Sequence, residues 1–191
     1  MMASPSGFTK LIKSLPKYLK VLDVGGGGLQ GENTTDALLE HFGTENVTGI
    51  CTSSHEVEVY QAQRAEKKLP KANIIDGNYY THDFNEQFDL VVLDLNVENN
   101  MKDWENEFSN LTYLKKDGFL ITYIIMTDEY GDPKETPALI RDHWKRFWKT
   151  EKLAPFHIGM KRIKGYEVYA HEKEERRTYI LWMLLRKTSG L

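Results

Sequence analysis

The sequence contains a single cysteine, Cys51, so it cannot form an intrachain disulfide. Its six histidines show neither a His-x-x-x-His pair nor the Cys/His spacing of a metal site. No apolar run approaches the roughly 20 residues needed to cross a bilayer, and the first 20 residues lack the apolar core of a signal peptide. These absences predict a cytoplasmic protein with no membrane segment and no metal centre.

Basic residues are scarce until late in the chain. Residues 1–140 hold 12 Lys and Arg against 22 Asp and Glu, whereas residues 141–191 hold 13 against 6. A basic C-terminal region beside an acidic body favours an anionic partner such as nucleic acid. A solvated helix face and hairpin would explain the same charges without any partner.

The length of 191 residues suits a single domain, residues 1–191, with residues 1–19 predicted as an N-terminal helix and arm. Strands and helices alternate, which predicts a parallel sheet with helices on both faces. Strands are expected at residues 20–24, 47–51, 72–75, 88–95 and 119–126, and helices at 34–42, 56–68, 101–114 and 137–149. A turn is expected at Asp117 and Gly118. The polar residues 127–137 are expected to form a loop that can serve as a lid.

Two late strands, residues 156–163 and 178–186, have no helix between them and are expected to form an antiparallel pair. Residues 166–170 can extend the first of them, and residues 171–177 are expected at an exposed hairpin tip. The predicted fold class is therefore α/β: a doubly wound, mostly parallel seven-stranded sheet with helices on both faces and an antiparallel C-terminal strand pair.

The most specific local signal is the run VLDVGGGG at residues 21–28, where a buried strand enters four glycines ahead of a helix. Glycine permits positive φ and close approach of a ligand, and the following helix points its free N–H groups at that ligand. Gly26, Gly28 and Gly31 match the dinucleotide pattern G-x-G-x-x-G. A nicotinamide-dependent oxidoreductase is one hypothesis, but the acid that it needs at the end of the second strand is absent.

The same run resembles motif I of class I (Rossmann-like) S-adenosylmethionine-dependent methyltransferases, in which an acid precedes Gly-x-Gly-x-Gly. Asp23, Gly25 and Gly27 match, while Leu29 stands where the third glycine is expected. The resemblance covers residues 20–126: NIIDGNYY is similar to the third strand and its loop, FDLVVLDL to motif IV and LKKDGFLI to the stretch before the fifth strand. It implies S-adenosyl-L-methionine as cofactor and S-adenosyl-L-homocysteine as product.

The resemblance also implies a set of cofactor contacts: Asp23, Gly25, Gly26, Gly27, Cys51, Thr52, Asp76, Asn78 and Asp94. In the family, the motif I acid reaches the methionine part, often through water, and a polar residue after the third strand meets the adenine amino group. The second strand usually ends in an acid that binds the ribose. Here it ends in Cys51, so either Thr52, Ser53 or backbone holds the ribose, or affinity is reduced.

No motif in the sequence identifies the methyl acceptor. The motif IV stretch at residues 94–97 lacks the Asp/Asn-Pro-Pro-aromatic pattern of amino-methylating nucleic-acid enzymes, and Cys51 is in the wrong strand for a cytosine C5 enzyme. His55 and His82 are candidate bases, and no catalytic residue is assigned. The basic C-terminal region favours RNA or another macromolecule as acceptor. A catalytically inactive methyltransferase-like scaffold is the alternative, supported by the missing acid.

Overall fold

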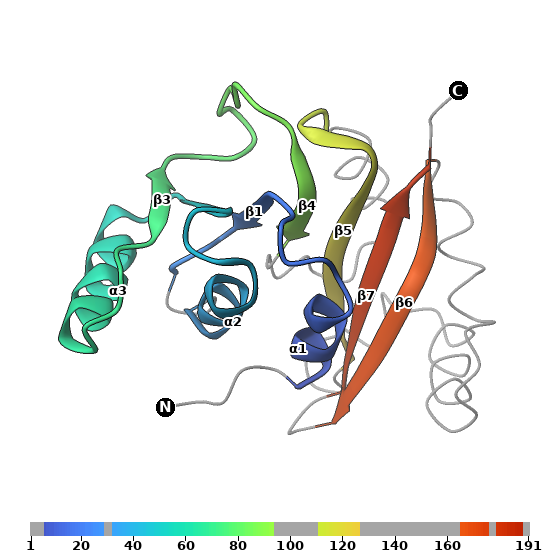
Figure 1. The fold of residues 1–191 in the computed structure, drawn as a ribbon, viewed down its shortest axis with the longest axis horizontal. Helices are drawn as coiled ribbons and strands as arrows, with labels where there is room; N and C mark the ends of the chain where they lie inside the picture. Colours follow the sequence, from blue (N-terminus) through green and yellow to red (C-terminus); the bar gives the residue numbers. More distant parts are fainter. Residues whose placement is uncertain (1–5, 29–31, 94–110, 127–164, 176–178, 189–191) are drawn as a thin grey trace, which may run out of the picture.

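The computed structural model describes residues 6–28, 32–93, 111–126, 165–175 and 179–188. Seven strands form one sheet in the order β3-β2-β1-β4-β5-β7-β6 (Figure 1). The strands are β1 (Val21–Val24), β2 (Val47–Cys51), β3 (Asn73–Asp76), β4 (Phe88–Leu93), β5 (Leu114–Met126), β6 (Tyr166–Glu175) and β7 (Tyr179–Lys187). Strands β1 to β5 are parallel to one another, and β7 is antiparallel to both β5 and β6. The predicted fold class is confirmed.

The central strands are buried on both faces, because their side chains alternate between two apolar cores. In β4, Leu90 and Val92 belong to one core, while Val91 and Leu93 belong to the other. A continuous apolar run is what such a strand requires. The predicted strand at residues 88–95 is therefore confirmed as the centre of the sheet, with its described part ending at Leu93.

Three helices cover the first of these cores: α1 (Ser6–Lys13), α2 (Glu32–Phe42) and α3 (Ser54–Glu66). Helices α1 and α2 lie in front of the sheet and α3 lies beside β3 (Figure 1). Phe8 of α1 is fully buried, with its ring centroid 5.0 Å from that of Trp182 in β7. The expected N-terminal helix thus packs on the sheet, and no helix among the described residues has the length and apolarity to cross a membrane.

Helix α3 begins two residues earlier than predicted because Ser53 caps it. The Ser53 hydroxyl accepts a hydrogen bond from the backbone N–H of Glu56 at 3.4 Å. Hydroxyl side chains at this position satisfy an N–H group that has no partner within the helix. The first turn of α3 is therefore fixed directly after the end of β2.

Two expectations about the later strands are wrong. The turn expected at Asp117 and Gly118 is a bulge inside β5: the strand pairs with β4 at Leu114, loses register, and pairs again from Phe119. Asp117 has a φ of 61°, which accommodates the extra residues. Leu114 accordingly begins a strand and does not end the helix predicted at residues 101–114, whose first ten residues lie outside the described part.

On its outer side β7 pairs with Tyr166–Glu175, which confirms residues 166–170 as part of the antiparallel pair; the strand expected at residues 156–163 lies outside the described residues. Residues 171–175, expected at a hairpin tip, are paired in β6. A charged sequence is tolerated there because β6 is the last strand of the sheet, and edge strands commonly carry charge. The predicted loop at 127–137 and helix at 137–149 also lie outside the described residues.

Candidate functional site

The ends of three parallel strands bring their following residues to one edge of the sheet. Val24 is in register with Ile50, and Cys51 is in register with Asp76. Strands that run in the same direction end at the same edge, where α/β folds place their ligands. The glycine turn after β1, the residues after β2 and those after β3 therefore meet at this edge.

The glycine turn is tightly closed and tied to β2. The N–H of Gly25 donates to the carbonyl of Ile50 at 2.8 Å, and the N–H of Gly28 donates to the carbonyl of Gly25 at 3.1 Å. Gly25 and Gly27 have φ of 85° and 77°, which only glycine adopts without strain. Two of the predicted cofactor-contact glycines thus hold conformations that exclude a side chain.

Asp23 lies beneath this turn and is fully buried. The hydroxyl of Thr35 in α2 donates to Oδ2 of Asp23 at 2.7 Å, and the N–H of Gly27 donates to the same hydroxyl at 3.0 Å. A Cβ added at Gly26 would lie 2.7 Å from that carboxylate oxygen. Asp23 and Thr35 therefore fix the turn from below. Sequence reasoning missed Thr35, because only the fold brings it beneath the turn.

The wall beside Gly27 is a packed polar cluster from α2 and α3. A Cβ added at Gly27 would collide with Ile74 and approach Tyr60 at 3.1 Å. The Tyr60 hydroxyl donates to Asp36 at 2.7 Å, and Arg64 forms an ion pair with the same carboxylate at 2.9 Å. Burial, together with Asp36, raises the pKa of Tyr60 far above its usual value. This ring stays neutral and supports the turn.

The end of β2 offers a buried thiol and a capped helix. Cys51 is 8% exposed, Thr52 is exposed, and the Ser53 hydroxyl is engaged as the cap of α3. Glu56, in the first turn of α3, points toward the glycine turn: a Cβ added at Gly28 would lie 2.9 Å from its Oε2 atom. Sequence reasoning missed Glu56, although the Ser-x-x-Glu pattern at residues 53–56 places an acid just after β2.

The end of β3 is joined to the end of β2. The N–H of Gly77 donates to the carbonyl of Cys51 at 2.9 Å, and the Ser54 hydroxyl donates to Oδ2 of Asp76 at 2.6 Å. Asn78 is exposed and its side-chain oxygen accepts from the N–H of Tyr80 at 2.9 Å, which shapes the next turn. Asp76 and Asn78 therefore lie at the same edge as the glycine turn, while Asp94 lies outside the described residues.

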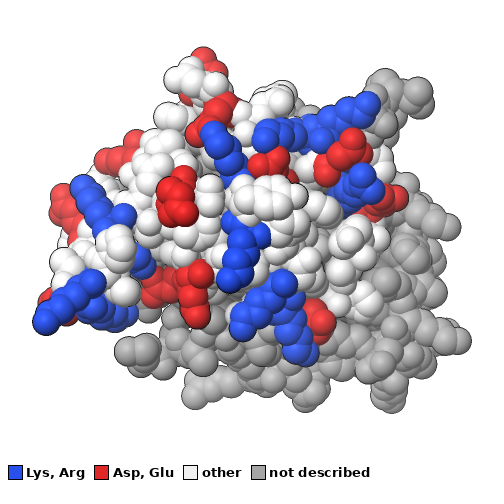
Figure 2. Space-filling model, in the orientation of Figure 1, with Lys and Arg blue, Asp and Glu red and all other residues white. Residues whose placement is uncertain are grey.

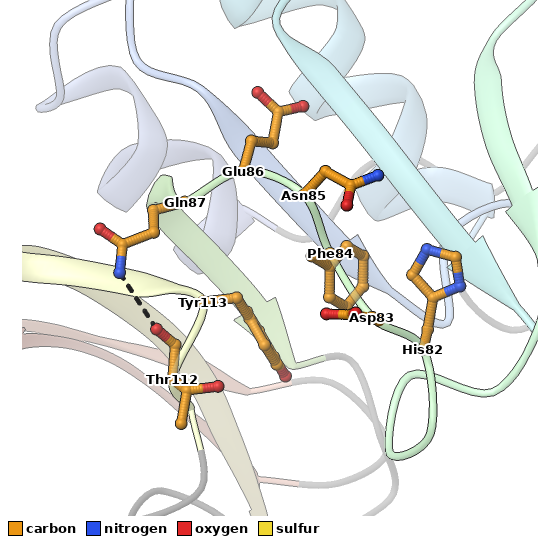
Figure 3. A pocket seen from close by; sticks show the side chains of 8 residues that line it. All are labelled: His82, Asp83, Phe84, Asn85, Glu86, Gln87, Thr112 and Tyr113. Atoms are coloured by element: carbon orange, nitrogen blue, oxygen red, sulfur yellow. Dashed lines mark hydrogen bonds between the residues drawn. The ribbon is translucent and has the colours of Figure 1, made fainter.

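A separate hollow of about 280 Å³ lies between the loop from β3 to β4 and the turn before β5 (Figure 3). Its lining includes His82, Phe84 and Tyr113, and the ring centroids of Phe84 and Tyr113 are 4.9 Å apart. Gln87 and Tyr113 directly precede β4 and β5, so this hollow reaches the amino ends of those strands. No residue of the glycine turn lines it, but His82 also lies near the end of β3, where a Cβ added at Gly77 would be 3.8 Å from its Nδ1 atom. The other candidate base, His55, is exposed in the first turn of α3.

The charged side chains of the described face are interspersed, with Lys and Arg beside Asp and Glu (Figure 2). Most of the basic residues after 140 lie outside the described residues. Two that are described have intramolecular partners: Arg186 pairs with Asp117 at 3.4 Å, and the Lys187 ammonium donates to the carbonyls of Leu111 and Leu114, each at 3.0 Å. Burial lowers the pKa of Lys187. These two side chains stabilise the sheet and give no support to an anion site.

Comparison with known proteins gives the fold. No protein-family model and no curated protein sequence matches the chain. Solved structures do match: a SAM-dependent methyltransferase from Aquifex aeolicus has a TM-score of 0.61 at 14% identity, covering 95% of this chain and 89% of its own. Coclaurine N-methyltransferase, bound to N-methylheliamine and SAH, has a TM-score of 0.60 at 13% identity, covering 94% of this chain and 72% of its own.

A tRNA methyltransferase from M. jannaschii matches with a TM-score of 0.58 at 12% identity over 96% of this chain. The chain spans about half of that protein, 49% of its length. The seven-stranded sheet described above is therefore the class I methyltransferase fold.

Proposed function

We propose that the chain is an S-adenosyl-L-methionine-dependent methyltransferase whose cofactor binds at the glycine turn. The observation that carries the proposal is the hydrogen-bonded chain from Gly27 through Thr35 to Asp23, which shapes the turn after β1 at the edge where β2 and β3 also end. The fold shared with SAM-dependent methyltransferases supports it.

The residues at this edge suit the chemistry of that cofactor. Carboxylates suit the α-ammonium group and ribose hydroxyls of the ligand, and Asp76 is an acceptor for an adenine amino group. The glycine turn supplies backbone that a ligand can approach without a Cβ in the way. The cofactor supplies an activated methyl group, so the chain's own task is to align an acceptor and exclude water.

For the acceptor, we infer RNA or another macromolecule, from the 13 basic residues at positions 141–191 against 6 acidic ones. One of the structural neighbours is a tRNA methyltransferase, which is compatible with that inference. Transfer of a labelled methyl group to total RNA, with total protein as the comparison, tests it. Labelling of protein alone would contradict RNA as the acceptor.

Calorimetric titration with S-adenosylmethionine, S-adenosylhomocysteine and NAD(H) tests the cofactor. We expect binding of both sulfur ligands. A response to NAD(H) alone would overturn the proposal in favour of an oxidoreductase, and no response to any ligand at millimolar concentration would favour a scaffold that binds no cofactor. Binding of S-adenosylhomocysteine with no methyl transfer to any acceptor would indicate an inactive relative.

Two substitutions connect that binding to the turn. Asp23→Ala is expected to abolish sulfur-ligand binding because it removes the carboxylate that fixes Thr35 beneath Gly27. Thr35→Val removes the bridging hydroxyl at nearly constant volume and is expected to destabilise the protein by about 1–3 kcal/mol. Thr35→Ser keeps the hydroxyl and is the matched control. Unchanged affinity in Asp23→Ala would show that the turn is not the cofactor site.

A further inference from the structure

Glu56 directs a carboxylate at the glycine turn from an unexpected element. It lies in the first turn of α3, where a negative charge is favoured by the helix dipole. A Cβ added at Gly28 would lie 2.9 Å from Oε2 of Glu56 and 3.8 Å from Sγ of Cys51. The carboxylate and the thiol at the end of β2 thus face the same point of the turn.

That point calls for an acid on chemical grounds. A ribose presents two adjacent hydroxyl donors, and a carboxylate can accept both hydrogen bonds; nucleotide-binding α/β folds place an acid at the end of the second strand for this purpose. Here the second strand ends in Cys51, whose sulfur is a weak acceptor. The strand itself therefore cannot supply the interaction.

The hydroxyl groups near the end of β2 are neutral, whereas a carboxylate makes charge-assisted hydrogen bonds, which are stronger. The Ser53 hydroxyl accepts from the N–H of Glu56, and the Ser54 hydroxyl donates to Asp76. Thr52 is exposed. Among the described residues of this connection, Glu56 is the acid whose side chain approaches the glycine turn.

We propose that Glu56 binds the ribose hydroxyls of the cofactor, so that the first turn of α3 provides the acid that the end of β2 lacks. The proposal rests on the proposed function, because it concerns the same ligand. It removes the main argument for an inactive scaffold: an acid is present at the ribose position, but it comes five residues later in the chain.

The test measures whether the Glu56 carboxylate and the 2′-hydroxyl of the ligand contribute to binding through each other. S-adenosylhomocysteine and its 2′-deoxy analogue are titrated into the full chain and into the Glu56→Gln variant. Losing a charged hydrogen-bond partner is expected to weaken S-adenosylhomocysteine binding roughly tenfold to a hundredfold. The 2′-deoxy analogue keeps only its 3′-hydroxyl contact with Glu56 and is expected to lose less, so the variant discriminates less between the two ligands than the native chain does.

The matched control is Glu58→Gln, an exposed acid on the same helix, which is expected to change neither affinity. If Glu56→Gln does not fold, Glu56→Asp gives the same comparison, because its shorter side chain reduces the reach of the carboxylate toward the ribose. Equal weakening of both ligands, or no weakening of either, would overturn the role of Glu56 and leave the proposed function standing. Failure of the native chain to bind S-adenosylhomocysteine would overturn the proposed function itself.

Discussion

The two ends of the sheet are built differently. On the β3-β2-β1 side the strands are four or five residues long, and each is followed by polar or glycine residues whose hydrogen bonds join one strand end to the next. On the β5-β7-β6 side the strands are 9 to 13 residues long, and β7 carries four consecutive buried residues, Trp182 to Leu185. The first end gathers polar groups and glycines at its edge, and the second consists of long strands with buried side chains.

The largest expected effect is a loss of stability on substitution of Trp182, at the end of the sheet away from the glycine turn. Trp182 is 3% exposed, with ring centroids of Phe8 and Tyr123 at 5.0 and 4.8 Å. Trp182→Ala is expected to reduce the free energy of unfolding by about 3–5 kcal/mol, measured by urea denaturation. Tyr18→Ala, where the ring is 77% exposed, is the control and is expected to change it by about 0.5 kcal/mol or less.

The folded fraction of Trp182→Ala is expected to bind S-adenosylhomocysteine as the native chain does. Trp182 lies in β7, and two strands, β5 and β4, separate it from β1. A tenfold or larger loss of affinity in the folded protein would show that the two ends of the sheet are not independent.

A smaller effect is expected from paired glycine substitutions, one at each end. Gly27 and Gly165 both have positive φ, 77° and 91°, so alanine at either position costs roughly 1–2 kcal/mol of left-handed strain. Only Gly27→Ala also collides with Ile74, whereas a Cβ at Gly165 meets no described atom within 4 Å. Gly27→Ala is therefore expected to cost about 1–3 kcal/mol more, and only this variant is expected to weaken ligand binding. Equal costs would contradict the packing described beside the turn.

The smallest effect is a difference in pH dependence. Burial raises the pKa of Tyr166 in β6 to about 12, from 10.0. Above pH 10 the unfolded chain releases this proton while the folded chain retains it, so stability falls as pH rises toward 12, by at most about 1.4 kcal/mol per pH unit. Tyr166→Phe removes this contribution, and its unfolding free energy is expected to fall less steeply over pH 10–12. Parallel curves for the two proteins would contradict the burial of this hydroxyl.

The sequence predicted the parallel end of the sheet well because its signals are local. The buried run at 88–93, the glycines after Val24 and the strand over Val47–Cys51 each depend on residues within one segment. The antiparallel end depends on pairing between distant segments. Nothing in residues 115–118 alone distinguishes a turn from a bulge, since the difference depends on β4 pairing with β5 on both sides.

The candidate site shows the same contrast between residues in one local motif and residues brought together by packing. Asp23, Gly25 and Gly27 could be proposed from the sequence because they belong to one continuous motif. Thr35 and Glu56 were missed because their relation to the turn arises from the packing of α2 and α3, across 12 and 28 residues of sequence from Asp23 and Gly28. Cys51 ends β2 as predicted, and the acid after it that approaches the turn, Glu56, comes from α3.

The position of β7 sets an order of assembly. Strand β7 follows β6 in the chain yet lies between β5 and β6 in the sheet. Lys187, its last residue, donates a hydrogen bond to the carbonyl of Leu111, which lies 76 residues earlier in the chain. During synthesis β6 is therefore complete before β7, the strand through which it joins the described sheet. Contacts of such long sequence separation slow folding. Among the described strands, β5 thus gains its antiparallel neighbour only after all the others have been made.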